Sequence, residues 1–96
     1  MPPVRRLVLD VLKPHDPSLL ELSTTLGTVE SVDAVSVSLV ELDNEVQNVR
    51  VTVEGADLDY DAVDEAVRGL GGSIHSVDQA ACGEYVVDER PTPQDG

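Results

Sequence analysis

Residues 7–27 read LVLDVLKPHDPSLLELSTTLG and place a strand, a turn and a helix in immediate succession. Apolar side chains alternate with others through residues 4–12, which is the period of a half-buried β-strand. Pro14 cannot donate a hydrogen bond to a sheet, so it marks the end of this strand. The stretch therefore opens a unit in which a strand is followed directly by a helix that packs against it.

The start of that helix is predicted from backbone chemistry. Asp16 stands where an N-cap belongs, and Pro17 stands at the first helical position, where a missing N–H costs nothing. Leucines then recur at helical spacing as far as Gly27, a residue typical of helix C-termini. These signals predict a helix over residues 17–27.

The rest of the chain adds three strands and one helix. Residues 32–42 and 46–54 alternate valine or leucine with other residues, and the short polar turn between them predicts a hairpin. An apolar stripe at helical spacing predicts a helix over residues 59–70. Residues 73–79 are predicted to form the last strand.

The order β-α-β-β-α-β predicts an α+β fold of the ferredoxin-like type. In this sandwich, a four-stranded antiparallel sheet with strand order 4-1-3-2 carries both helices on one face. We expect residues 1–83 to form one such domain. Residues 84–96 are expected to form a short acidic tail, in which residues 88–96, DERPTPQDG, have the composition of a disordered segment.

The composition is strongly acidic. The net charge is −13, from 19 acidic and 6 basic residues, and Lys13 is the sole lysine. This balance argues against nucleic acids and anionic membranes as partners, because both require a basic surface. An acid-rich, lysine-poor surface suits a cytoplasm with molar salt, so we predict a halophilic protein. The alternative is an ordinary acidic protein.

Cysteine content and hydropathy indicate a cytoplasmic location. Cys82 is alone, so no disulfide can form within one chain. No run of about 18 apolar residues predicts a transmembrane helix, and the N-terminal residues lack the apolar region of a signal peptide.

The sheet face turned away from the helices is expected to be mildly polar and poor in carboxylates. A solvated face of a halophilic protein would carry more of them, so we predict that a second copy of the chain covers this face. The alternative is a solvated sheet. Asp10 and Arg50 are expected to pair there. The candidate interface residues are Val8, Asp10, Leu12, Val40 and Arg50.

The two histidines suggest a metal site. The end of the first strand meets the start of the antiparallel fourth strand, which predicts that His15 lies near His75. Taking the third strand as parallel to the first also brings Glu54 and Asp57 to this rim, beside Asp16. Imidazoles with carboxylates are ligands for divalent transition metals.

Other interpretations of these groups stay open. Calcium or magnesium would suit the carboxylates of residues 43–45 or 57–61, although neither segment matches an EF-hand. Alternatively, His15 bonds backbone carbonyls in a turn and His75 is a neutral, hydrogen-bonded ring. The chain has no Gly-rich phosphate loop, no serine elbow and no predicted Cys–His pair, so we predict that it is not an enzyme.

Two paired motifs, LDVLKPH at residues 9–15 and EG-x-DLD…GG-x-IHS-x-D over residues 54–78, resemble a small archaeal family, the domain-of-unknown-function family two-eleven. The resemblance covers residues 4–83. It implies a ferredoxin-like fold, ring-like homo-oligomers, calcium ions and no established activity. The motif residues are Asp10, Lys13, Pro14, His15, Glu54, Gly55, Asp57, Asp59, Gly71, Gly72, His75 and Asp78.

Two functions are therefore predicted. The first is a non-catalytic assembly or binding module that forms a homo-oligomer and binds divalent cations at acidic rims. The alternative is a regulatory domain that senses a small metabolite or a metal at a corner between strands or subunits, as amino-acid-sensing domains of this fold do.

Overall fold

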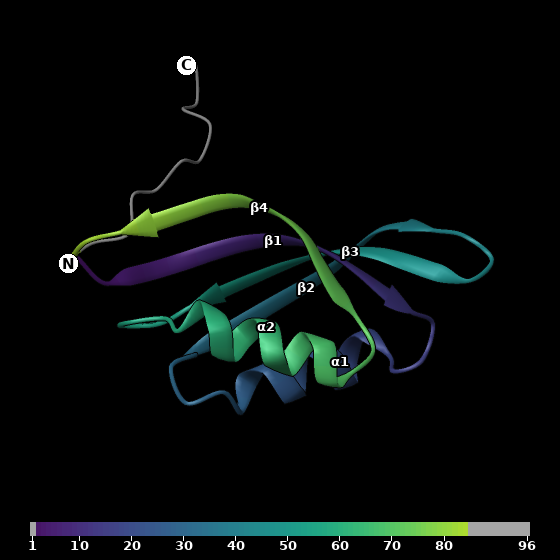
Figure 1. The fold of residues 1–96 in the computed structure, drawn as a ribbon, viewed down its shortest axis with the longest axis horizontal. Coiled ribbons are helices and arrows are strands. Elements are labelled where there is room, and N and C mark those ends of the chain that lie inside the picture. The colour runs from purple at the N-terminus through teal and green to yellow at the C-terminus, as the bar shows by residue number, and fades with distance from the viewer. Residues whose placement is uncertain (1, 85–96) are drawn as a thin grey trace, which may run out of the picture.

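The computed structural model describes residues 2–84, which contain six elements in the predicted order (Figure 1). The predicted tail lies, apart from Glu84, outside the described residues. The strands run two or three residues further at some ends than the sequence predicts. The elements are β1 (Val4–Pro14), α1 (Leu19–Gly27), β2 (Ala34–Leu42), β3 (Val46–Glu54), α2 (Tyr60–Gly69) and β4 (Ser73–Cys82).

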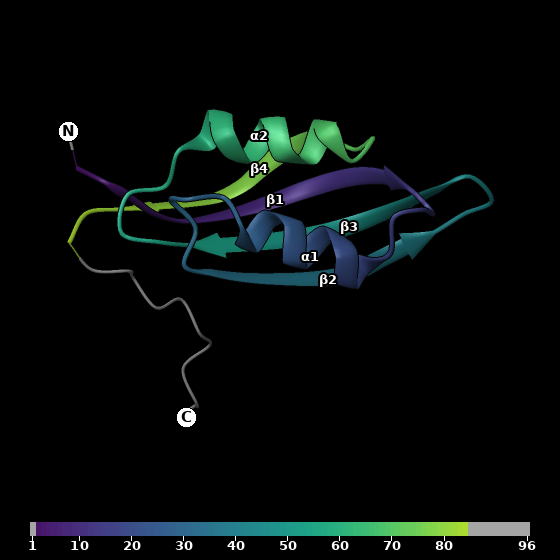
Figure 2. The same ribbon diagram turned by 90° about the horizontal axis from the view of Figure 1, so that it is seen from below.

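The four strands form one antiparallel sheet in the order β2-β3-β1-β4, which is the predicted order seen from the other edge. Both helices lie on the same face of this sheet, α1 beside β2 and α2 beside β4 (Figure 2). The other face, which we call the open face, carries no element among residues 2–84. The chain has the ferredoxin-like α+β fold.

The predicted direction of β3 is wrong. It runs antiparallel to β1, with Arg6 opposite Glu54 and Pro14 opposite Val46. A helical crossover makes β1 and β2 parallel, and the tight hairpin after β2 reverses the chain. The strand inserted between them must therefore oppose both, so Glu54 lies at the start of β1 rather than at its end.

The core lies between the helices and the inner face of the sheet and is entirely aliphatic. Inward positions of β1 alternate with open-face positions, and the inward positions of β3 stand directly opposite them. This alternation positions every open-face side chain. The buried core residues are Leu7, Leu9, Val11, Leu22, Leu26, Val32, Val49, Val51, Val53, Leu58, Val63 and Val67.

The predicted start of the first helix is wrong by two residues. Helix α1 begins at Leu19, and Ser18 is its N-cap, with Ser18 Oγ accepting a hydrogen bond from the Glu21 amide at 3.1 Å. A serine at this position satisfies an N-terminal amide as well as Asp16 would. Pro17 instead follows a cis peptide bond and is buried. In α2 the N-cap is Asp59, whose carboxylate accepts a hydrogen bond from the Ala62 amide at 3.2 Å.

Gly55 follows β3 at a point where two backbones touch. Its amide donates to the Arg5 carbonyl at 3.1 Å, and a Cβ added here would overlap the Ser31 carbonyl oxygen. A side chain would therefore push the loop before β2 away from the end of β3.

Gly55→Ala is expected to destabilise the fold by about 1–3 kcal/mol, because overpacking at backbone forces the loop to move. Gly27→Ala is the matched control, since a Cβ there meets nothing within 4 Å. Chemical denaturation at high salt measures both free energies of unfolding. Equal stabilities of the two variants would show that the contact at Gly55 is not tight.

Candidate functional site

Lys13 is buried near the end of β1, with 2% of its surface exposed. It occupies an inward position of the strand, beyond the last core valine. Its Nζ donates to the Pro14 carbonyl and to Gln47 Oε1, each at 2.7 Å, and to the His15 carbonyl at 3.4 Å. The three donors of the ammonium thus have three acceptors, and the turn is fastened to β3.

Burial lowers the pKa of Lys13, while the nearby carboxylate of Asp16 acts in the opposite direction. A buried cation is tolerated only when it is hydrogen-bonded, which the three acceptors provide. The sequence analysis did not predict these hydrogen bonds of Lys13. The sequence did contain a signal for them. Lys13 occupies an inward position directly after a run of apolar inward positions in the same strand.

His15 bonds the β2–β3 hairpin rather than a second histidine. Its Nε2 lies 2.8 Å from the Asp43 carbonyl oxygen, which accepts a hydrogen bond from the ring. The Asp43 carboxylate accepts from the amides of Glu45 and Val46, both at 3.0 Å, and closes the turn. These backbone hydrogen bonds lower the pKa of Asp43. His15 therefore bonds a backbone carbonyl, as one interpretation predicted, but that carbonyl belongs to the β2–β3 hairpin and not to its own turn.

His75 lies near the start of β4 and borders a hollow in the open face with a volume of about 220 Å³. Asp10 and Asn48 belong to the same lining, and the Asn48 amide donates to the Asp10 carboxylate. The hollow combines carboxylates, an amide, an imidazole and aliphatic groups. The lining residues are Asp10, Leu12, Glu41, Asp43, Val46, Asn48 and His75.

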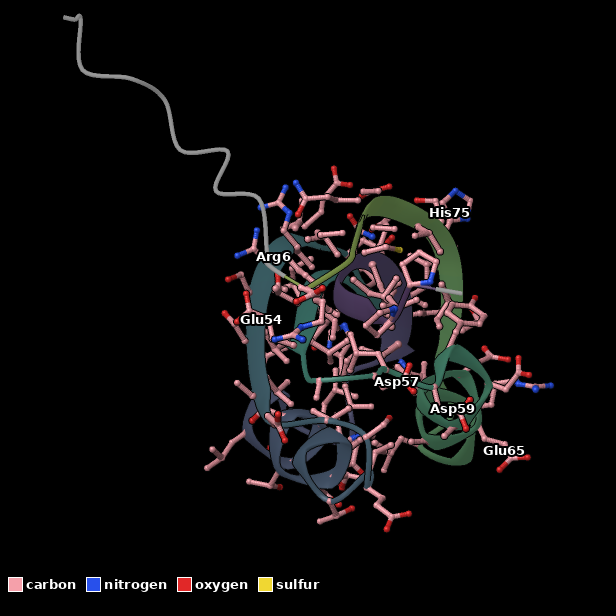
Figure 3. All side chains as sticks on the ribbon, turned by 90° about the vertical axis from the view of Figure 1, so that its left-hand side faces the viewer. Arg6, Glu54, Asp57, Asp59, Glu65 and His75 are labelled. Carbon is pink, nitrogen blue, oxygen red and sulfur yellow. The ribbon has the colours of Figure 1, made fainter. Side chains whose placement is uncertain are left out.

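The predicted rim of His15, Asp16, Glu54, Asp57 and His75 does not form. Glu54 binds Arg6 at the opposite end of β1, with 2.7 Å between Arg6 Nε and Glu54 Oε2. Figure 3 shows these two side chains together, well apart from His75, and Asp57 in the loop that follows β3. For Glu54 and Asp57 the error follows from the direction of β3, whereas His15 turns to the hairpin instead of His75. Within residues 2–84, no three His, Cys, Asp or Glu side chains are close enough to hold a metal ion.

The candidate interface residues of the two central strands lie on the open face. Val8, Asp10 and Leu12 alternate with the buried inward residues of β1, and Arg50 stands opposite Asp10. The expected Asp10–Arg50 ion pair is not formed, because Asp10 accepts a hydrogen bond from Asn48 instead. Val40 lies at an irregularity of the β2–β3 pairing and is 50% exposed.

The fold and this hollow define a small ferredoxin-like protein with an open, partly acidic sheet face. The family model DUF211, described as uncharacterized ArCR, matches residues 5–96, and the chain belongs to this family. The chain is similar to the uncharacterized protein MJ0319 of Methanocaldococcus jannaschii. The two are 42% identical over 92 residues, which cover 96% of this chain and 95% of the relative. No helix in residues 2–84 is long and apolar enough to cross a membrane.

Replacing Lys13 by methionine is expected to destabilise the protein by about 1–3 kcal/mol, because Gln47 and two carbonyls lose their donor. The double variant with Gln47→Leu should recover part of this loss. Urea denaturation of the parent, the Lys13→Met variant and the double variant measures their free energies of unfolding. A Lys13→Met variant as stable as the parent would show that the hydrogen bonds of Lys13 contribute nothing to the stability of the fold.

The difference in the free energy of unfolding between the parent and Lys13→Met also depends on pH. Because the folded-state pKa of Lys13 is lowered from 10.5, the unfolded chain holds the proton at pH values where the folded chain releases it. The parent should therefore gain stability relative to the variant as pH rises through the folded-state pKa toward 10.5.

Proposed function

We propose that the protein is a non-catalytic assembly module that forms homo-oligomers through the end of the β2–β3 hairpin and the adjoining open face. The observation that carries this proposal is a group of exposed apolar side chains at the end of the hairpin of a very acidic chain, of which Leu39 and Leu42 lie on the inner side of the sheet and Val46 on the open face. We call it the hairpin patch: Leu39, Val40, Leu42 and Val46, with 47%, 50%, 57% and 39% of their surfaces exposed.

The position of the hairpin explains the exposure. The hairpin extends past the ends of both helices, so the helices do not cover its apolar side chains (Figure 1). Clustered apolar residues on a protein surface mark interaction sites. The small aliphatic core gives a second reason for association, because domains of this size commonly gain stability from a partner.

The occupant we propose is a second copy of the chain. Glu41, Asp43 and Glu45 flank the hairpin patch, so two copies repel each other at low salt and approach when the charges are screened. Divalent cations shared between the carboxylates of the two copies would reduce the repulsion further, since hard cations prefer oxygen ligands. This supports assembly at high salt or with cations.

Leu42→Lys is expected to weaken assembly by about tenfold or more, because one buried leucine contributes about 1.5–3 kcal/mol. Leu20→Lys is the matched control, since Leu20 is 74% exposed and belongs to α1 rather than to the hairpin. Both changes reduce the net negative charge equally, so only the site differs. Sedimentation equilibrium at low salt, high salt and with Ca²⁺ measures the effect.

A parent protein that is monomeric under all three conditions would refute the assembly function. Equal association of the two lysine variants would show instead that the hairpin patch is not the interface.

The hollow beside His75 favours a second candidate function, a regulatory domain that binds a small metabolite or a metal. Its volume of about 220 Å³ and its mixture of imidazole, carboxylate and aliphatic groups suit a small polar ligand.

Thermal shift titrations with Ca²⁺, Zn²⁺ and amino acids test this candidate. His75→Ala should abolish a ligand-induced shift, and Glu65→Gln should preserve it, because Glu65 is exposed on α2 and does not line the hollow. The absence of any shift in the parent, or a loss in both variants alike, would argue against a site in the hollow.

A further inference from the structure

The start of β1 holds an arginine whose side chain lacks an acceptor. Arg5 Nε is buried, and no atom within residues 2–84 accepts a hydrogen bond from it. The ion pairs found in this part of the chain use Arg6 and Arg68 and leave Arg5 out. A buried donor without an acceptor costs free energy, so such a group is expected to bind water, an ion or a ligand.

Arg5 lines a hollow with a volume of about 210 Å³. The hollow lies where the start of β2 and the loop after β3 meet the start of β1, beside the ion pair of Arg6 and Glu54 that Figure 3 shows. It shares no residue with the hollow beside His75. The lining residues are Arg5, Asp33, Ala34, Glu54, Gly55 and Ala56.

Backbone contacts hold this lining in place. Arg5 stands at a shift in the β1–β4 register and has no residue opposite it on β4, a type of irregularity that redirects side chains. The Asp33 amide donates to the Glu54 carbonyl at 2.8 Å, and the Gly55 amide donates to the Arg5 carbonyl at 3.1 Å. The backbone that carries the charged groups is therefore ordered before a ligand binds, which lowers the entropic cost of binding.

The hollow presents a cation and an anion that do not neutralise each other. Glu54 is already bound to Arg6. Asp33 is exposed, and no ion pair joins its carboxylate to Arg5 or to another cation within residues 2–84. The groups left over are one guanidinium and one carboxylate in the lining of the same small space.

A ligand that carries both charges complements this lining. A simple anion would be attracted by Arg5 but repelled by Asp33 and by the net charge of −13. A metal cation would be repelled by Arg5. A zwitterion avoids both penalties, because its carboxylate accepts from the guanidinium while its ammonium donates to Asp33.

The size of the hollow limits the ligand further. Its volume of about 210 Å³ lies below the range of about 300–1,000 Å³ typical of pockets for drug-sized molecules. Ala34 and Ala56 supply only methyl groups to the lining. The hollow therefore suits a molecule with a short side chain.

We propose that this hollow binds a small free α-amino acid such as alanine. Arg5 donates to the ligand carboxylate, and Asp33 accepts from the ligand ammonium. The proposal is independent of the assembly function and of the hollow beside His75, since it uses other residues.

Three ligands separate the two charges: L-alanine, alaninamide, which lacks the carboxylate, and N-acetylalanine, which lacks the ammonium. Amide NMR spectra of the full chain in molar KCl follow each titration. Alanine is expected to shift the signals of residues 33–34 and 54–56. It should bind at least about tenfold more tightly than either analogue, because each analogue loses a charge-assisted hydrogen bond.

Variants assign each charge to its residue. Asp33→Asn should remove the preference for alanine over N-acetylalanine, and Arg5→Gln should remove the preference for alanine over alaninamide. Asp61→Asn and Arg50→Gln change the same charges outside the hollow and should preserve both preferences. Because Asp33 is exposed, its variant tests the proposal even if Arg5→Gln does not fold.

The absence of a saturable shift with alanine, or equal affinities for the three ligands, would overturn the proposal and leave the assembly function as it stands. Shifts confined to Asn48 and His75 would also overturn it, because they would place the amino acid in the other hollow.

Discussion

The buried ammonium of Lys13 holds together the end of the molecule at which the candidate sites lie. It joins the turn after β1 to Gln47 of β3, and the same turn presents His15 to the carbonyl of Asp43. These two contacts fasten the end of the hairpin, residues 39–48, which extends beyond the helices and contributes none of the buried core residues. The hollow and the hairpin patch depend on them, since both use residues from this hairpin.

The sequence predicted the fold well because its local signals are unambiguous. Valine and leucine alternation marks the strands, and the connections are short enough to leave one topology. Local rules misplaced the start of α1, because Asp16 and Ser18 are both good N-caps and only the turn geometry chooses between them. The candidate site failed for a topological reason, since one wrong strand direction moved Glu54 to the wrong end of β1.

Several motif residues of the chain hold the backbone in its conformation. Lys13 and His15 fasten the hairpin, Asp59 caps α2, and Gly55 allows two backbones to touch. Gly71 adopts a φ of +85°, a conformation that favours glycine, in the turn before β4. These residues specify the fold, so their presence in a motif gives no evidence for a ligand.

Asp10 and His75 are different, because the fold does not require them. A β-strand accepts many side chains on an open face, and a histidine at a register shift in an edge strand stabilises no core contact. Both line the hollow beside the hairpin patch. A functional site is therefore expected on the open face, at the acidic hollow beside the end of the hairpin, rather than at the turn that holds His15.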